Sequence, residues 1–123
     1  MKYFIDNNLP EKLANAIREI VDGDYEVIHL KGKFPQHEAD EVWIKILMEE
    51  GDWVIITQDG RIKNHEIWKD CGLTSIFLAK GYVHLPFYQK VGKIIGVWPS
   101  IVDKCENSRP GSVFTLQLNG KLK

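Results

Sequence analysis

The chain has 123 residues, of which 44% are hydrophobic, 27% are charged and 11% are aromatic. This composition excludes a disordered or fibrous protein, and the length is that of one globular unit, so we expect a single domain over residues 1–123. Sixteen basic residues against seventeen acidic ones leave a formal net charge of −1. Such a balance argues against a protein that coats nucleic acid through bulk positive charge, so any function is expected to depend on a local site.

The sequence has no segment typical of membrane insertion or secretion. No apolar run approaches the roughly 18 residues that a membrane span needs, and the stretch Met1–Asp6 becomes acidic too soon for a signal peptide. We therefore expect a cytoplasmic protein with no membrane partner. The cysteines Cys71 and Cys105 have no CxxC spacing and no clustered histidines, so neither a zinc site nor a disulfide framework is indicated.

Strand-like and helix-like segments alternate along the chain. Short branched and aromatic runs predict strands at residues 2–6, 25–30, 53–57, 75–79 and 113–118. Apolar residues three and four apart predict helices at residues 10–21, 39–50, 64–71 and, broken at Pro99, 87–106. Asn7 or Asn8 is the expected N-cap of the first helix. The alternation is typical of an α/β protein with a mainly parallel sheet, in which the unbroken apolar run 53–57 lies near the middle.

Three acidic residues fall where this topology brings distant segments together. Asp6 ends the first strand, Asp59 follows the third strand by two residues, and Asp40 begins the helix that leads into the third strand. In a parallel sheet with right-handed crossovers all strands end at one edge, and a helix that precedes a strand starts at that edge. We therefore expect the three carboxylates to share the carboxyl edge. Each alone could be a cap or a turn former, so the expectation depends on their coincidence there.

Carboxylates that share an edge repel one another unless a cation neutralises them. A pair at about 4 Å costs on the order of 4 kcal/mol at an effective dielectric of about 20. A hard divalent ion such as Mg²⁺ or Mn²⁺ takes oxygen ligands and keeps several bound waters. Asp6, Asp40 and Asp59 are thus candidate metal ligands and candidate catalytic residues. A metal-activated water suits phosphodiester hydrolysis, because the ion also neutralises the charge that builds on the phosphate.

Three segments resemble the PIN-like domains of bacteria and archaea, especially the compact branch grouped with VapC-like toxins. They are Phe4–Pro10, Ala39–Trp43 and Val54–Asp59, and the resemblance covers roughly the first eighty residues. It implies a three-layer α/β/α sandwich of the Rossmann-like kind and a Mg²⁺- or Mn²⁺-dependent endoribonuclease with RNA as its substrate. It also implies the toxin of a toxin-antitoxin pair, neutralised by a cognate antitoxin protein. A homodimer is left open as the oligomeric state.

The resemblance assigns roles position by position. Asp6 matches the family's acid after the first strand, and Asp40 matches the acid that starts the helix before the third strand. Thr57 and Asp59 match the family's T-x-D pair. Four residues near the same edge are expected to bind the substrate: Asn7, Thr57, Arg61 and Lys63.

Two other functions remain open on the sequence alone. Larger PIN domains carry a further acid on a segment that this chain lacks, and the spacing does not assign Glu38, Glu41 or Glu66 in its place. The chain could therefore be a catalytically inactive PIN-like module that binds a protein partner. A receiver-like phosphoacceptor domain would also place acids after the first and third strands and a lysine such as Lys80 near a later strand end. Receivers usually carry paired acids after the first strand, where this chain has asparagines, so the pattern fits them less well.

Overall fold

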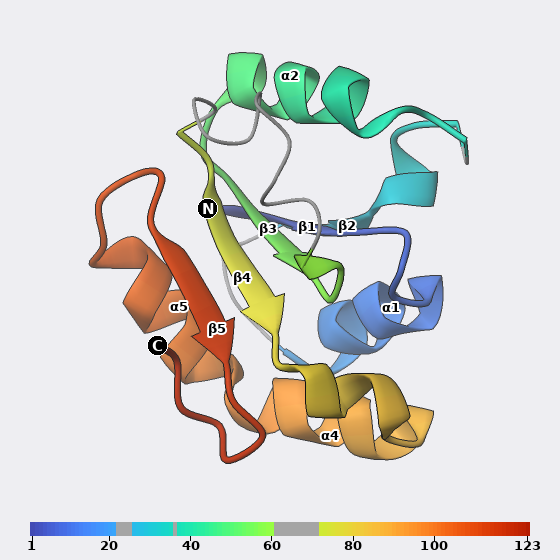
Figure 1. Cartoon of the computed structure of the whole chain (residues 1–123), viewed down its shortest axis with the longest axis vertical. Helices are drawn as coiled ribbons and strands as arrows, with labels where there is room; N and C mark the ends of the chain where they lie inside the picture. The colour runs from blue at the N-terminus through green and yellow to red at the C-terminus, as the bar shows by residue number, and fades with distance from the viewer. Residues whose placement is uncertain (22–25, 36, 61–71) are drawn as a thin grey trace.

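A five-stranded parallel sheet organises the protein (Figure 1). The computed structural model describes residues 1–21, 26–35, 37–60 and 72–123. The strands are β1 (Lys2–Ile5), β2 (Glu26–His29), β3 (Trp53–Thr57), β4 (Thr74–Leu78) and β5 (Val113–Leu116). Their order in the sheet is β2-β1-β3-β4-β5, so β3 occupies the centre as its unbroken apolar sequence predicts.

Helices cover both faces of this sheet. They are α1 (Glu11–Ile20), α2 (Asp40–Glu50), α4 (Phe87–Gly96) and α5 (Trp98–Glu106), with short 3₁₀ turns η1 (Leu30–Gly32) and η3 (Lys80–His84). One hydrophobic core joins the sheet to α1, α4 and α5, and a second core joins the other face to α2. The α/β/α sandwich with a parallel sheet is therefore confirmed.

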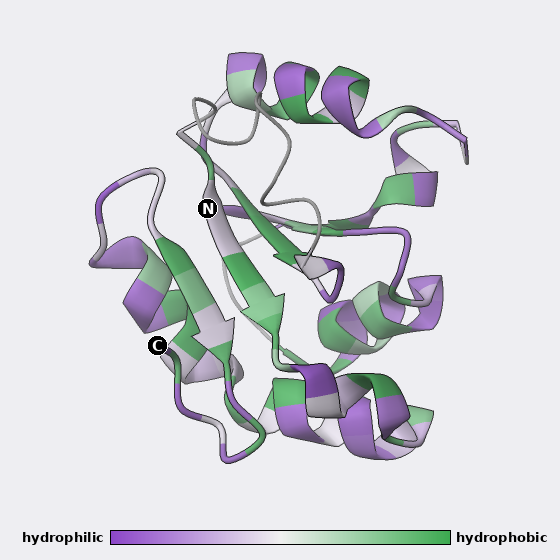
Figure 2. Ribbon diagram, viewed as in Figure 1, coloured by the Kyte–Doolittle hydropathy of each residue, from purple (hydrophilic) through white to green (hydrophobic). Residues whose placement is uncertain are grey.

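The alternation of side chains along β1 shows how one strand serves both cores. Tyr3 and Ile5 enter the core under α1, whereas Phe4, between them, enters the core under α2. The strands are accordingly hydrophobic and the outer helix faces are polar (Figure 2). Among the described helices, none is both long enough and apolar enough to cross a membrane.

Two expectations about helix ends need correction. Pro10, not an asparagine, is the N-cap of α1, and it provides no side-chain hydrogen bond because its ring has no polar atom. The Asn8 side chain contacts Asp6 and Thr57 at the sheet edge instead. The long C-terminal helix is broken as predicted, but the break lies at Val97 and Pro99 sits in the first turn of α5. Proline is tolerated there because first-turn amides have no partner within the helix. The helix predicted at residues 64–71 lies outside the described residues.

Candidate functional site

Asp6 occupies the carboxyl edge of the sheet beside β3. Ile5 pairs with Ile56, and the Asp6 amide continues the ladder by donating to the Ile56 carbonyl at 3.0 Å. Asp6 is thereby fixed next to Thr57, the last residue of β3. The side chain of Asp6 is only 6% exposed, which is unusual for a carboxylate.

Three hydrogen bonds hold the Asp6 carboxylate. Its Oδ1 accepts from the Asn7 amide at 2.6 Å, and its Oδ2 accepts from Thr57 Oγ1 at 2.9 Å and from Asn8 Nδ2 at 3.2 Å. Thr57 Oγ1 in turn accepts from Asn8 Nδ2 at 2.9 Å and from the Asp59 amide at 3.1 Å. Thr57 is fully buried, and its hydroxyl donates to Asp6. Thr57 therefore positions the Asp6 carboxylate.

The other two acids lie close enough to act on Asp6 electrostatically. Burial raises the pKa of the Asp6 carboxyl above its ordinary value of 3.8, hydrogen bonds from Thr57 and Asn7 lower it, and the negative charges of Asp40 and Asp59 raise it further. The net direction is upward. Burial is the largest cause of the shift, and the charges of Asp40 and Asp59 add a smaller effect of the same sign. That these three acids act together as one site stays a prediction.

Asp40 and Asp59 are held differently from Asp6, and both are half-buried. Asp40 is the first residue of α2, where the helix dipole favours a carboxylate, and its Oδ1 accepts from Trp43 Nε1 at 3.0 Å. The Asp59 backbone is tied to Thr57 two residues earlier. Asp40 is thus oriented by the core under α2, whereas Asp59 is oriented by the end of β3.

The edge offers oxygen donors of the kind that a hard divalent cation prefers, but not an enclosing set of them. Among the described residues, no three acidic, histidine or cysteine side chains lie close enough to enclose a metal ion. Mg²⁺ is usually bound through only one or two carboxylates plus waters and substrate phosphates, so an enclosing set is not needed. Asp6 Oδ1 accepts a single described hydrogen bond and retains a lone pair for a ligand. Assignment of Asp6, Asp40 and Asp59 as metal ligands stays a prediction.

The edge also contains polar residues that the sequence did not single out. Asn8 Oδ1 accepts from the Gln58 amide at 3.2 Å, and Gln58 Nε2 donates to the Asn8 carbonyl at 3.2 Å. Lys90 of α4 reaches the same place, where its Nζ donates to Gln58 Oε1 at 3.1 Å. These partners are separated by 50 and 32 positions in the chain, so no local motif could have indicated them.

The expected substrate-binding residues have different outcomes. Asn7 is exposed at the edge and its amide contacts Asp6. Arg61 and Lys63 lie outside the described residues. Their roles, and that of Thr57 in contacting substrate, stay predictions.

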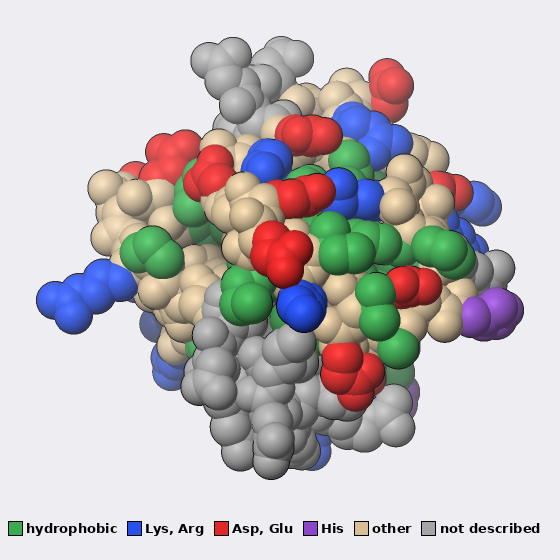
Figure 3. Space-filling model, turned by 90° about the horizontal axis from the view of Figure 1, so that it is seen from above, with side chains coloured by type: hydrophobic (Ala, Val, Ile, Leu, Met, Phe, Trp, Pro, Cys, Tyr) green, Lys and Arg blue, Asp and Glu red, His purple; other side chains and the backbone are tan. Residues whose placement is uncertain are grey.

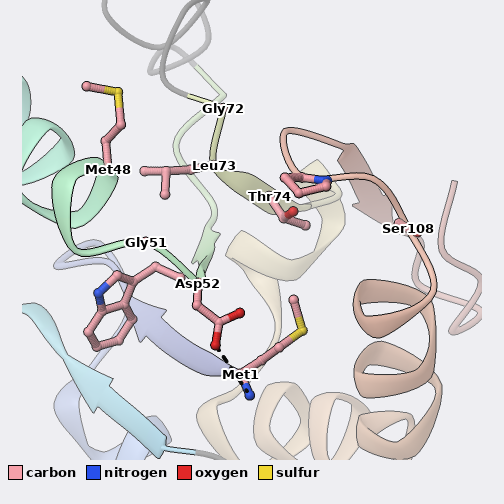
Figure 4. A pocket seen from close by; sticks show the side chains of 10 residues that line it. Met1, Met48, Gly51, Asp52, Gly72, Leu73, Thr74 and Ser108 are labelled. Carbon is pink, nitrogen blue, oxygen red and sulfur yellow. Dashed lines mark ion pairs between the residues drawn. The ribbon is translucent and has the colours of Figure 1, made fainter.

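Other surfaces are less suited to a polyanion. A hollow of about 270 Å³ between Met1, Met48 and Leu73 lies where β1, β3 and β4 begin, which is the edge opposite Asp6 (Figure 4). Its carboxylate, Asp52, faces the N-terminal ammonium at 3.8 Å. The surface on the α2 side of the molecule has acidic, basic and hydrophobic side chains interspersed (Figure 3). Neither place gathers positive charge among the described residues.

The raised pKa of Asp6 predicts a pH-dependent difference in stability. A raised pKa makes folding most favourable when the carboxyl is protonated, and this contribution is lost as pH rises from 3.8 through the raised value. Asp6→Asn removes the charge but also the Oδ2 acceptor of two hydrogen bonds, so in metal-free buffer we expect its stability relative to the wild type to be greatest at neutral pH and to decline as pH falls towards 3.8. Urea unfolding across the pH range measures it, with Asp103→Asn on exposed α5 as control. A stability difference between the two proteins that does not change with pH would contradict the assignment.

Together, the parallel sheet and its acidic carboxyl edge define a class: α/β proteins that place their chemistry where the strands end. Comparison with protein families matches residues 1–80 to the family described as "PIN like domain". The chain belongs to the PIN-like domain family, a fold generally associated with nucleases. No curated protein and no solved structure matches it in the other two comparisons. The family assignment favours a nuclease-type site over the receiver-like alternative.

Proposed function

We propose that the chain is a metal-dependent endoribonuclease that hydrolyses RNA phosphodiesters. The observation that carries the proposal is the buried Asp6 carboxylate, held at the sheet edge by three hydrogen bonds while Asp40 and Asp59 act on it. Burial, and to a smaller extent the two neighbouring charges, disfavour the ionised form of Asp6, and bound Mg²⁺ or Mn²⁺ would offset this penalty. Membership of the PIN-like family supports the same chemistry.

The residues divide into ligands and supports. Asp6, Asp40 and Asp59 would offer carboxylate oxygens to the ion. When bound, Mg²⁺ or Mn²⁺ lowers the pKa of a bound water and neutralises charge on the phosphate. Thr57 and Asn8 fix the orientation of Asp6, so that the carboxylate needs little rearrangement to act.

The proposal extends to biology as the toxin of a toxin-antitoxin pair, with a cognate antitoxin protein as partner. Exposed apolar side chains close together in the sequence support a protein contact: Val83 of η3 and Phe87 and Tyr88 at the start of α4 are each at least 41% exposed. A homodimer could use such side chains as well. Both partners and a cytoplasmic location belong to the proposal.

Metal binding and RNA cleavage test the proposal directly. Millimolar Mn²⁺ or Mg²⁺ should raise the melting temperature of the purified chain, and single-stranded RNA should be cut only when the metal is present. Asp59→Asn should weaken both effects, whereas Asp103→Asn should leave them unchanged. RNA that stays intact in the presence of either ion would reject the nuclease.

A catalytically inactive binding module is the second candidate. It is favoured by one observation, that the described residues contain no enclosing group of three metal ligands. Calorimetric titration with Mn²⁺ separates the two candidates. Heat of binding that is abolished in Asp6→Asn supports the nuclease, whereas no binding at millimolar Mn²⁺ supports the module.

A further inference from the structure

Lys90 is a buried cation beside the acidic edge. The residue is only 8% exposed, although lysine is among the residues least often buried. Its described hydrogen-bond partner is the uncharged Gln58 Oε1 at 3.1 Å. Neither ion pair found among the described residues includes it.

Burial of an ammonium without an anion is unfavourable. An isolated charge loses its hydration and is retained only when other groups or a ligand compensate. An ammonium has three donor hydrogens, and Gln58 accepts one of them. The other two hydrogens have no acceptor among the described residues.

A hollow next to Gln58 could admit such an anion. It has a volume of about 600 Å³ and lies at the carboxyl ends of β3, β4 and β5. Its lining includes Gln58 and the exposed Lys80, while Lys90 lies against Gln58 from α4. Gln58 also contacts Asn8, which contacts Asp6, so the hollow and the acidic cluster share one network.

We propose that Lys90, with the hollow beside Gln58, forms a subsite for a backbone phosphate of single-stranded RNA. Gln58 and Asn8 connect this subsite to Asp6 by hydrogen bonds, so the phosphate it binds would be a neighbour of the one that is cut. A lysine contacts phosphate as a compact point charge on a flexible stem, which suits a strand whose sequence is not read. The inference rests on the proposed function, since it names the substrate contact of that same edge.

Binding can be measured without cleavage. Fluorescence anisotropy of a labelled single-stranded RNA in EDTA, repeated over a series of salt concentrations, gives Kd and its salt dependence. Lys90→Met should raise Kd about tenfold and reduce the slope of log Kd against log salt by about 0.7, the value for one phosphate contact on a single strand. Lys90→Gln, which can still hydrogen-bond Gln58, should behave like Lys90→Met because the charge is what matters.

Lys93→Met is the matched control. Lys93 is an exposed lysine of the same helix whose Nζ donates to the Leu118 carbonyl at 3.1 Å, and its replacement should leave the slope unchanged. Thermal unfolding provides the second readout: Lys90→Met should melt at the same or a higher temperature, because it removes an uncompensated buried charge. A structural lysine would show the opposite, with a lower melting temperature and an unchanged slope.

The outcomes separate the subsite from the nuclease. RNA binding that depends on Lys90 in a chain that cuts no RNA would retain the subsite and reject the nuclease. Cleavage by the wild type, with the same Kd and slope in Lys90→Met and Lys93→Met, would reject the subsite alone. Absence of RNA binding by the wild type at low salt would overturn the inference.

Discussion

Asp6→Asn is expected to lower metal-dependent RNA cleavage by about a thousandfold, or about 4 kcal/mol of transition-state stabilisation. Asparagine keeps the shape of the side chain and one acceptor oxygen for the Asn7 amide, but it removes the negative charge that a divalent ion requires. The measurement is single-turnover cleavage of a labelled RNA at saturating Mn²⁺.

The stability of the same variant makes this result interpretable. Loss of activity through unfolding would leave no cooperative melting transition above the assay temperature, whereas a folded Asp6→Asn variant keeps one and gains stability relative to the wild type as pH rises in metal-free buffer. Asp103→Asn provides the matched control for a single lost aspartate on an exposed helix. Cleavage by Asp6→Asn at the wild-type rate would remove Asp6 from the chemistry.

The fold followed from the sequence because local and global preferences agree along most of the chain. The apolar residues of β3 can all be buried only if both faces of the strand are covered, and the described structure places β3 at the centre of the sheet. The strand predicted at residues 113–118 lies at the sheet edge as β5. Helix ends were less predictable, because competing side-chain contacts decide them. Asn8 serves the sheet edge and not the helix, which no propensity could indicate.

The acidic edge was predictable for a topological reason, and its details were not. Parallel connectivity assigns Asp6, Asp40 and Asp59 to the edge where strands end, without any knowledge of side-chain directions. Which groups surround them depends on rotamers and on packing between distant elements. The contact of Gln58 with Lys90 joins the residue that follows β3 to α4, and no sequence spacing indicates such a pair.

Trp43 connects the core under α2 to this edge, and its replacement should have the largest effect on stability. The indole is fully buried, stacks on Phe4 with ring centroids 5.1 Å apart, and donates from Nε1 to Asp40 Oδ1 at 3.0 Å. Trp43→Ala leaves a cavity and should lower the free energy of unfolding by about 3–5 kcal/mol, as measured by urea denaturation. A loss below about 1 kcal/mol would mean that α2 is not held by this residue.

Trp43→Phe separates packing from the hydrogen bond to Asp40. An aromatic ring remains against Phe4, so most of the stability should be retained, but Asp40 loses the donor that orients it. Trp53→Phe is a matched control, because Trp53 also contacts Phe4 while its Nε1 donates at 2.8 Å to Glu50, at the far end of α2 from Asp40. We expect Trp43→Phe to weaken Mn²⁺-dependent stabilisation and Trp53→Phe to leave it intact. Both variants lose one indole hydrogen bond, but only the bond of Trp43 ends at Asp40. Equal Mn²⁺-dependent stabilisation of the two variants would therefore show that the orientation of Asp40 by Trp43 does not matter.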